Sequence, residues 1–311
     1  MGDMTGTPDQ LLLTPQNTAD LTAPTAAVLG DRTPEDLRAL AVRVASEAAA
    51  HVRRSRAGLH GRVAVADTKS SAVDPVTAVD RSSETVIRQR LAELAAGDAV
   101  LGEENGGALA PDRVTWVADP IDGTVNFVYG IPSSAVSIAA VVDGVPVAAA
   151  VADIVRQRVF SACAGGRAMV SGEAEPDGRL TGGRVLQVGT ETPTALSTAL
   201  VGTGFSYGAD RRRQQAELLV TVLPRVRDIR RIGSAALDLC AVAAGSLDAY
   251  YEHGLGPWDH AAGALVAARA GAVVHQASLS AGSDRGLCTF AAVPSVADEL
   301  ADLVTTVSFP A

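Results

Sequence analysis

Helical periodicity opens the ordered part of the chain. Thr33 can cap a helix that has Pro34 at its first position and Asp36 three residues after the cap. The apolar residues that follow recur every three to four positions, as on the buried face of a helix. A second helical pattern runs over residues 82–96, with Gly97 as its stop. The inward positions are Leu37, Leu40, Ala41, Val44, Ala45 and Ala48 in the first helix and Ile87, Leu91 and Leu94 in the second.

Short apolar runs in the middle of the chain predict an antiparallel sheet. The two longest, residues 135–142 and 145–153, are separated by Asp143-Gly144, a dipeptide typical of a tight hairpin turn. The other predicted strands of this sheet are residues 99–101, 114–118, 158–162 and 168–170.

Beyond a polar, glycine-rich boundary at residues 171–183, extended and helical patterns alternate. This alternation predicts an α/β half with a mixed sheet, packed on an α+β half. We therefore divide the chain into a loose tail (1–32) with one docked turn near residues 11–13, an N-terminal half (33–182) and a C-terminal half (183–311). The segments predicted in the last half are extended at 184–188, 199–203, 247–252 and 272–275, and helical at 214–223, 234–244, 258–270 and 296–307.

Composition narrows the function classes. The chain has 311 residues of which 47% are hydrophobic, enough to bury a large core. Its 35 acidic and 26 basic residues give a net charge of -9, a poor match to nucleic acid or to an anionic membrane. The longest apolar stretch is broken by Asp143-Gly144, so we expect no membrane span. Three scattered cysteines and no secretory signal layout predict reduced thiols and a cytoplasmic protein.

Acidic residues collect at the ends of two predicted strands. Asp119 and Asp122 follow residues 114–118, and Glu103 and Glu104 follow residues 99–101. Carboxylates this close repel one another unless cations lie between them, and carboxylate oxygens suit Mg²⁺ or Mn²⁺. The sequence therefore predicts a multi-cation site that acts on a phosphate.

The Asp-Pro-Ile-Asp-Gly-Thr segment has a geometry suited to such a site. Pro120 disfavours a helical conformation at Asp119, so both aspartates can face one point, with the Ile121 carbonyl as a possible further ligand. Gly123 allows close backbone approach, and its amide and that of Thr124 can hold a phosphate if they open a helix. An isolated Asp-x-x-Asp-Gly is as often a capped turn, so the other acids carry the argument.

Three further acids extend the pattern. Asp80 lies near the start of the second helix, Asp259 lies at the start of a helix of small residues, and Glu252 ends the preceding strand. In isolation, Asp259 is equally well explained as an N-cap and Glu252 as a solvated charge. A zinc site at His253 and His260 lacks a His-Glu-x-x-His spacing, so we expect each histidine either to pack or to support the residues that form the site.

Four spaced motifs resemble those of the inositol monophosphatase family, Mg²⁺-dependent and lithium-sensitive sugar-phosphate phosphatases. The resemblance covers nearly everything from Thr33 onward and implies a layered α-β-α-β-α sandwich and a homodimer. Val125 departs from the Thr that is common in the family, and residues 166–172 lack its usual Asn-Gly. The motifs are Lys69-Ser-Ser…Asp74-Pro-Val-Thr-Ala-Val-Asp80, Gly102-Glu103-Glu104, Asp119-Pro-Ile-Asp-Gly-Thr-Val-Asn-Phe127 and Trp258-Asp259-His-Ala-Ala-Gly263.

The resemblance also implies roles for individual residues, with two to three Mg²⁺ ions in each site. Water activated by these ions would hydrolyse the phosphate monoester. The implied roles are Glu103, Asp119 and the Ile121 carbonyl for the first metal, Asp119, Asp122 and Asp259 for the second, Glu103 for a looser third, Asp80 and Thr124 to orient and deprotonate the water, the Gly123 and Thr124 amides for the phosphate, and Asp122, Ala235, Glu252 and Asp259 for the inositol hydroxyls.

Inositol 1-phosphate is the first candidate substrate, because Asp248-Ala-Tyr-Tyr-Glu252 resembles the inositol-phosphate branch. Fructose 1,6-bisphosphate, histidinol phosphate and a nucleotide 3′-phosphate remain open as sugar or polyol phosphate alternatives. An aspartyl-phosphate mechanism needs an acid two residues before Asp122, where Pro120 stands. A non-catalytic partner-binding scaffold is the alternative of another class, and the acidic cluster argues against it.

Overall fold

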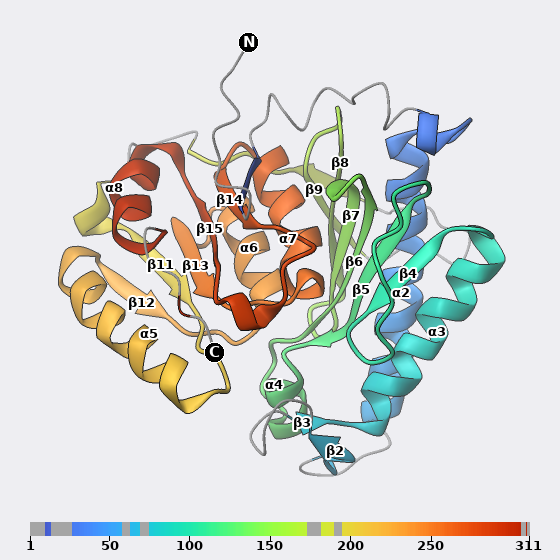
Figure 1. The fold of residues 1–311 in the computed structure, drawn as a ribbon, viewed down its shortest axis with the longest axis horizontal. Helices are drawn as coiled ribbons and strands as arrows, with labels where there is room; N and C mark the ends of the chain where they lie inside the picture. The colour runs from blue at the N-terminus through green and yellow to red at the C-terminus, as the bar shows by residue number, and fades with distance from the viewer. Residues whose placement is uncertain are drawn as a thin grey trace.

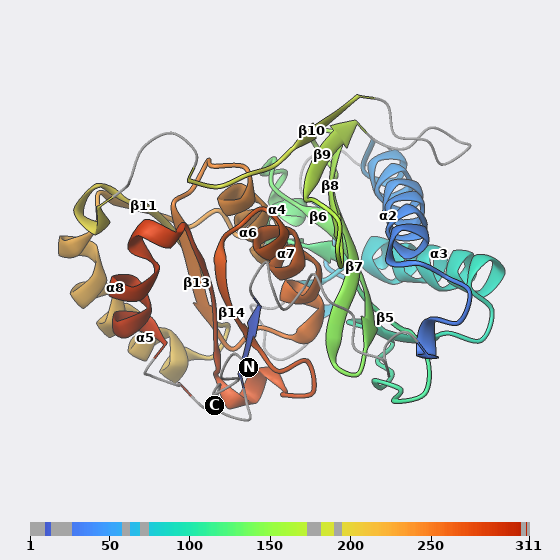
Figure 2. The same ribbon diagram turned by 90° about the horizontal axis from the view of Figure 1, so that it is seen from above.

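Layers of helix and sheet alternate across the molecule. The computed structural model describes residues 10–13, 27–57, 63–68, 75–172, 182–189, 195–305 and 309. Outer helices cover a seven-stranded sheet, a central pair of helices separates it from a six-stranded sheet, and further helices cover the far side (Figure 1; Figure 2). This arrangement confirms the layered sandwich predicted from the sequence. Residues 69–74, which carry part of the first motif, lie outside the described residues.

Helices α2 (Pro34–Ala57) and α3 (Ala78–Leu94) form the layer outside the seven-stranded sheet. The predicted cap of α2 is confirmed, because the Thr33 backbone N–H donates to Asp36 Oδ2 at 2.8 Å and the Asp36 N–H donates to Thr33 Oγ1 at 3.2 Å. Leu94, predicted to face inward, is 38% exposed, so that assignment is wrong.

The start of α3 lies earlier than the apolar pattern indicated. Thr77 caps the helix by accepting hydrogen bonds from the backbone N–H groups of Val79 and Asp80. The Asp80 side chain in turn accepts a hydrogen bond of 2.8 Å from the Thr77 N–H. Asp80 therefore lies within the first turn of α3, where it is held rigidly and is 0% exposed.

The seven-stranded sheet has the order β10-β9-β8-β7-β6-β5-β4. Its predicted hairpin is confirmed, and Asp143 and Gly144 take φ angles of 51° and 75° in the turn. Neighbouring strands are antiparallel as predicted, except for the parallel pair β4–β5 at one edge. The strands are β4 (Ala99–Gly102), β5 (Thr115–Asp122), β6 (Ala135–Val142), β7 (Val145–Asp153), β8 (Arg158–Cys163), β9 (Met169–Gly172) and β10 (Gly183–Val185).

The six-stranded sheet is mixed, as predicted, with the order β1-β14-β15-β13-β11-β12. Strand β11 is parallel to both β12 and β13, and the other pairs are antiparallel. The sequence patterns missed β12 and β15, which are short or fully buried and so lack a clear alternation. The strands are β1 (Gln10–Leu13), β11 (Leu200–Thr203), β12 (Asp228–Arg230), β13 (Ala249–His253), β14 (Val273–Ala277) and β15 (Cys288–Ala292).

Two short segments depart from the predicted division of the chain. Strand β1, expected to be a docked turn in a loose tail, is an edge strand antiparallel to β14, with Leu13 1% exposed. Strand β10, placed by the sequence in the second half, pairs with β9 of the first sheet. Both segments complete a sheet edge, a non-local pairing that apolar periodicity does not report.

Helices α6 and α7 fill the space between the sheets (Figure 2). Their small residues permit this close packing: a Cβ on Gly263 would lie 2.8 Å from Leu239 Cβ. No helix in the described part of the chain is long and apolar enough to cross a membrane. The remaining elements are α4 (Thr124–Tyr129), α5 (Ala209–Val222), α6 (Ala235–Ala243), α7 (Pro257–Arg269), α8 (Pro294–Val304), the short pair β2 (Asp67–Thr68) and β3 (Pro75–Val76), and the 3₁₀ turns Leu196–Thr198, Leu223–Arg225 and Ser283–Arg285.

Candidate active site

A bulge at the end of β5 directs two aspartates toward one cavity. Asp119 pairs with Ser137 and Asp122 pairs with Ala135, so β5 has one residue more than β6 over this interval. In a regular strand, side chains three residues apart point to opposite faces. The extra residue removes that alternation, and both carboxylates line a cavity of about 890 Å³.

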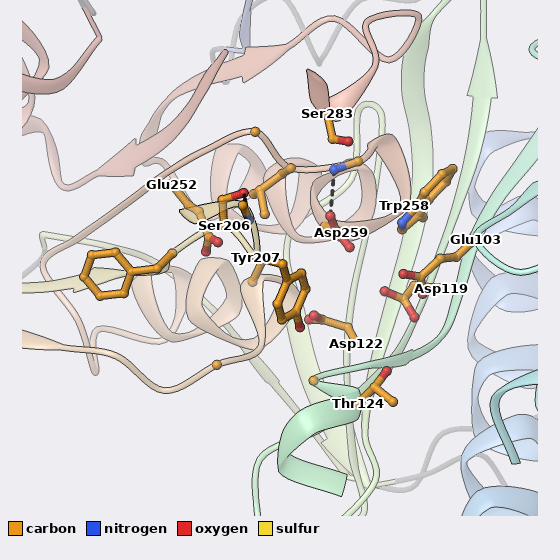
Figure 3. A pocket seen from close by; sticks show the side chains of 18 of the residues that line it. Glu103, Asp119, Asp122, Thr124, Ser206, Tyr207, Glu252, Trp258, Asp259 and Ser283 are labelled. Atoms are coloured by element: carbon orange, nitrogen blue, oxygen red, sulfur yellow. Dashed lines mark hydrogen bonds between the residues drawn. The ribbon is translucent and has the colours of Figure 1, made fainter. Parts of the chain in front are cut away.

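Three carboxylates meet in this cavity (Figure 3). One oxygen from each of Glu103, Asp119 and Asp259 lies within 4.8 Å of the others. Glu103 follows β4, Asp119 belongs to β5 and Asp259 lies in the first turn of α7, so the group joins both halves of the chain. Asp259 is fixed by a hydrogen bond of 2.7 Å from the Gly256 N–H to its Oδ2.

Burial and mutual repulsion act on these acids. Burial raises the pKa of Asp259 well above its usual range, and the charges of Glu103 and Asp122 add to the effect. Burial likewise raises the pKa of Asp122 to about 6, although hydrogen bonds from Ser234 and the Ala236 N–H oppose the rise. Hard oxygen donors held close together against their own repulsion fit a divalent cation, so this cluster could bind metal.

Asp122 lies on the same cavity and has a different set of contacts. Its Oδ2 accepts hydrogen bonds of 2.6 Å from Ser234 Oγ and 2.7 Å from the Ala236 N–H. The Ile121 carbonyl oxygen lies 3.0 Å from Thr124 Oγ1. Both residues implied as metal ligands line the cavity, and Oδ2 of Asp122 is already hydrogen-bonded to the protein.

Thr124 links the cavity to Asp80. Thr124 lines the cavity, whereas Asp80 is 0% exposed behind it. Thr124 Oγ1 lies 3.0 Å from Asp80 Oδ1, and the other Asp80 oxygen accepts a hydrogen bond from the Thr77 N–H. Within the part of the chain that the structure describes, the Thr124 hydroxyl links Asp80 to the cavity.

Gly123 makes the tight turn between β5 and α4. Its φ of 92° lies in the left-handed region, which favours glycine. A Cβ here would lie 2.9 Å from the Ser133 carbonyl oxygen and 3.0 Å from that of Gly233. Only glycine thus allows the segments that carry Ser133 and Gly233 to close around the turn, and Gly123 and Thr124 both line the cavity.

Ala235 and Glu252 line the side of the cavity formed by the second half of the chain. The Tyr250 hydroxyl donates a hydrogen bond of 2.6 Å to Glu252 Oε2. A Cβ on Gly204 would lie 1.8 Å from the same oxygen, so the absence of a side chain there makes room for the carboxylate. Burial raises the pKa of Glu252, and the Tyr250 hydrogen bond opposes the rise.

Several residues of the site were not found from the sequence. Arg211, in the first turn of α5, is 7% exposed and donates hydrogen bonds of 2.6 Å to the Phe309 carbonyl and 2.8 Å to that of Asp284. These partners are distant in sequence, so no local pattern signals them. Ser234 stands directly before the apolar residues of α6, where a serine typically caps a helix. No local pattern signals its bond to Asp122.

The histidines and cysteines have structural surroundings. His253 and His260 are 1% exposed, and their rings are hydrogen-bonded to the Val304 carbonyl and to Gln276 Nε2. Both histidines are therefore packed in the interior, one of the two roles expected for them. Cys163, Cys240 and Cys288 are free and buried, as reduced thiols would be.

Comparison with known proteins gives one consistent result. The model of the inositol monophosphatase family matches residues 33–304. A Mycobacterium tuberculosis protein named Inositol-1-monophosphatase SuhB is 53% identical over an alignment of 282 residues that covers 87% of this chain and 93% of that protein. A Mycobacterium leprae protein named Inositol-1-monophosphatase is 52% identical over 282 residues, with 87% and 94% covered.

The fold agrees with these sequence matches. The solved structure of Mycobacterium tuberculosis SuhB superimposes with a TM-score of 0.72 at 51% identity, covering 89% of this chain and 98% of that one. The resemblance seen in the four motifs is thereby confirmed over nearly the whole chain. The protein belongs to the inositol monophosphatase family.

Proposed function

We propose that this protein hydrolyses a phosphate monoester of a sugar or polyol in a Mg²⁺-dependent reaction, with inositol 1-phosphate as its first substrate. The convergence of Glu103, Asp119 and Asp259 within 4.8 Å of one another carries the proposal. The names of the mycobacterial relatives, at 52 to 53% identity, support the substrate.

The acids would hold the cations. Glu103, Asp119 and the Ile121 carbonyl form one ligand set, and Asp119, Asp122 and Asp259 form the other. Their oxygens suit Mg²⁺, and Mn²⁺ is an acceptable substitute. Bound Mg²⁺ supplies positive charge against the phosphate dianion and lowers the pKa of water.

Thr124 and Asp80 would position the attacking water. When Thr124 Oγ1 donates its proton to Asp80 Oδ1, its lone pairs are left to accept a hydrogen bond from water in the cavity. The water then passes a proton to Thr124 Oγ1 while Thr124 passes its own proton to Asp80 Oδ1, so Asp80 is the final proton acceptor. The backbone amides of Gly123 and Thr124 would hold the phosphate oxygens opposite this water.

Glu252 and Ala235 would face the alcohol portion of the substrate. A carboxylate held by Tyr250 presents its other oxygen as an acceptor for polyol hydroxyls. The small side chain of Ala235 leaves room for the ring beside it. Substrate choice therefore resides mainly in the second half of the chain.

The test is phosphate release from inositol 1-phosphate, fructose 1,6-bisphosphate, histidinol phosphate and a nucleotide 3′-phosphate. Each substrate is assayed with Mg²⁺, with EDTA and with added lithium. We expect the fastest release from inositol 1-phosphate, abolished by EDTA, inhibited by lithium and absent in Asp259→Asn. Faster release from another substrate would change the substrate assigned. No Mg²⁺-dependent release from any of them would overturn the proposal in favour of a partner-binding scaffold.

A further inference from the structure

One face of α3 contacts three segments that carry site residues. Asp80, Ser83 and Glu84 lie at positions i, i+3 and i+4, which share a helix face, and each is 0% exposed. Asp80 bonds to Thr124, and Ser83 Oγ donates to the Pro120 carbonyl at 3.3 Å. Glu84 contacts the third segment, the turn after β4, and has no role in the reaction described above.

The Glu84 carboxylate is hydrogen-bonded on both oxygens to this turn. Its Oε2 accepts from the Glu104 N–H at 2.7 Å, and its Oε1 accepts from the Asn105 N–H at 3.2 Å and from Asn105 Nδ2 at 3.0 Å. Arg88 Nε donates to Oε1 at 2.7 Å. Arg88 also donates from Nη2 to the Gly106 carbonyl at 2.6 Å, so the arginine and the glutamate are both hydrogen-bonded to the same turn.

The Glu84 carboxylate is fully buried, and burying a charge without hydrogen-bond partners costs free energy. Most of its partners belong to the turn. Gly102, the residue before Glu103, is constrained by the same carboxylate. A Cβ on Gly102 would lie 2.5 Å from both Cδ and Oε1 of Glu84. Both neighbours of Glu103 in the chain therefore contact Glu84: Gly102 packs against its carboxylate, and Glu104 donates its N–H to it.

We propose that Glu84 is a positioning residue that sets the direction of the Glu103 carboxylate and thereby the affinity of the cluster for its divalent cation. The inference rests on the proposed function, because it takes Glu103 as a ligand. Glu84 does not line the cavity and acts through the turn at residues 102–105. Outer contacts of this kind typically change metal affinity by about 10- to 100-fold.

The test variant is Glu84→Gln, which replaces one acceptor oxygen with an NH₂ group that cannot accept the turn's N–H bonds. Mg²⁺ binding is measured by titration calorimetry and by the rise in melting temperature that Mg²⁺ produces, both without substrate. We expect the Mg²⁺ dissociation constant to increase about 10-fold. The kcat at saturating Mg²⁺ should remain close to that of the wild type, because the ligands themselves are unchanged.

The matched control is Glu47→Gln. Glu47 accepts hydrogen bonds from Arg43 and Arg90 and so ties α2 to α3 without contacting the turn. The Glu47→Gln variant should have a lower melting temperature and an unchanged Mg²⁺ dissociation constant. A purely structural role for Glu84 would give the same result in both variants.

If Glu84→Gln does not fold, Arg88→Gln is the second variant. It removes the donor bonds to Glu84 and to the Gly106 carbonyl from a partly exposed side chain, and we expect a smaller increase in the same dissociation constant. An unchanged dissociation constant in a folded variant, while Asp259→Asn loses binding, would overturn the role of Glu84 alone. Absence of Mg²⁺ binding by the wild-type protein would instead overturn the proposed function.

Discussion

Ser234, at the start of α6, donates a hydrogen bond of 2.6 Å to Oδ2 of Asp122, at the end of β5. The two residues belong to opposite halves of the chain, and the Ala236 N–H donates to the same oxygen at 2.7 Å. The N-terminus of α6 therefore favours the ionised form of Asp122 and partly offsets the rise in its pKa that burial causes. The site depends in this way on how the two halves are packed.

Ser234→Ala should shift the pH dependence of activity. Without the hydroxyl, the pKa of Asp122 rises further, and the acid limb of the kcat/KM profile moves to higher pH. Loss of the helix cap should also lower the free energy of unfolding by about 1 kcal/mol. Ser234→Thr retains the hydroxyl and is the control. The same acid limb in Ser234→Ala and in the wild type would contradict the role of this hydrogen bond.

Asp122→Asn should stabilise the metal-free protein at neutral pH. The pKa of Asp122 is raised from 3.8 to about 6 by burial, so between these values the unfolded chain binds fewer protons than the folded one. Stability associated with this group is thus full below pH 3.8 and is lost as pH rises toward about 6. At about 1.4 kcal/mol per pH unit, the loss is at most about 3 kcal/mol.

The measurement is urea unfolding in EDTA from pH 4 to pH 7, comparing Asp122→Asn with the wild type. Burial lowers the pKa of His260 to about 3, which acts in the opposite direction but cancels between the two proteins. Mg²⁺ binds the ionised acid, so its stabilising effect on the wild type should grow with pH and be small in the variant. Identical pH slopes in EDTA would refute the assignment to Asp122.

Gly123→Ala should be far more harmful than Gly97→Ala. Both glycines have left-handed backbones, with φ of 92° and 96°, but a Cβ meets nothing within 4 Å at Gly97. We expect a loss of about 1 kcal/mol of folding free energy at Gly97 and about 3 kcal/mol at Gly123, where the Cβ meets backbone oxygens. Activity should fall only in Gly123→Ala, as measured by chemical denaturation and steady-state kinetics. Equal costs at the two sites would mean that the turn can widen.

Glu252→Gln should raise KM more than it lowers kcat. The change weakens the acceptor offered to the polyol and removes none of the oxygens near the phosphate. We expect about a 10-fold higher KM for inositol 1-phosphate, the size of one hydrogen bond to a charged group. Glu217→Gln, on the exposed surface of α5, is the control. An effect confined to kcat would place Glu252 at the reacting phosphate instead.

Local patterns predicted most of the elements. The cap at Thr33, the turn at Asp143-Gly144 and the strands on either side of it depend on neighbouring residues, and the structure has them as predicted. Prediction was poorest where an element depends on a distant partner. The edge strand β1 and the shift of β10 to the first sheet are both of this kind.

The amino-acid sequence by itself determined which residues supply the carboxylates and the glycine turn of the site, because strand ends, helix caps and glycine turns are encoded within a few residues. The tertiary structure alone decided the contacts that make those acids work together. Three of these contacts join segments that meet only in the folded chain. They are the irregular pairing of β5 with β6 between Asp119 and Asp122, the hydrogen bond from Ser234 to Asp122, and the hydrogen bonds of Glu84 to the turn after β4. The reason is physical: periodicity records which face of an element is buried, whereas burial raises a pKa or fixes a carboxylate only through the particular atoms packed against it.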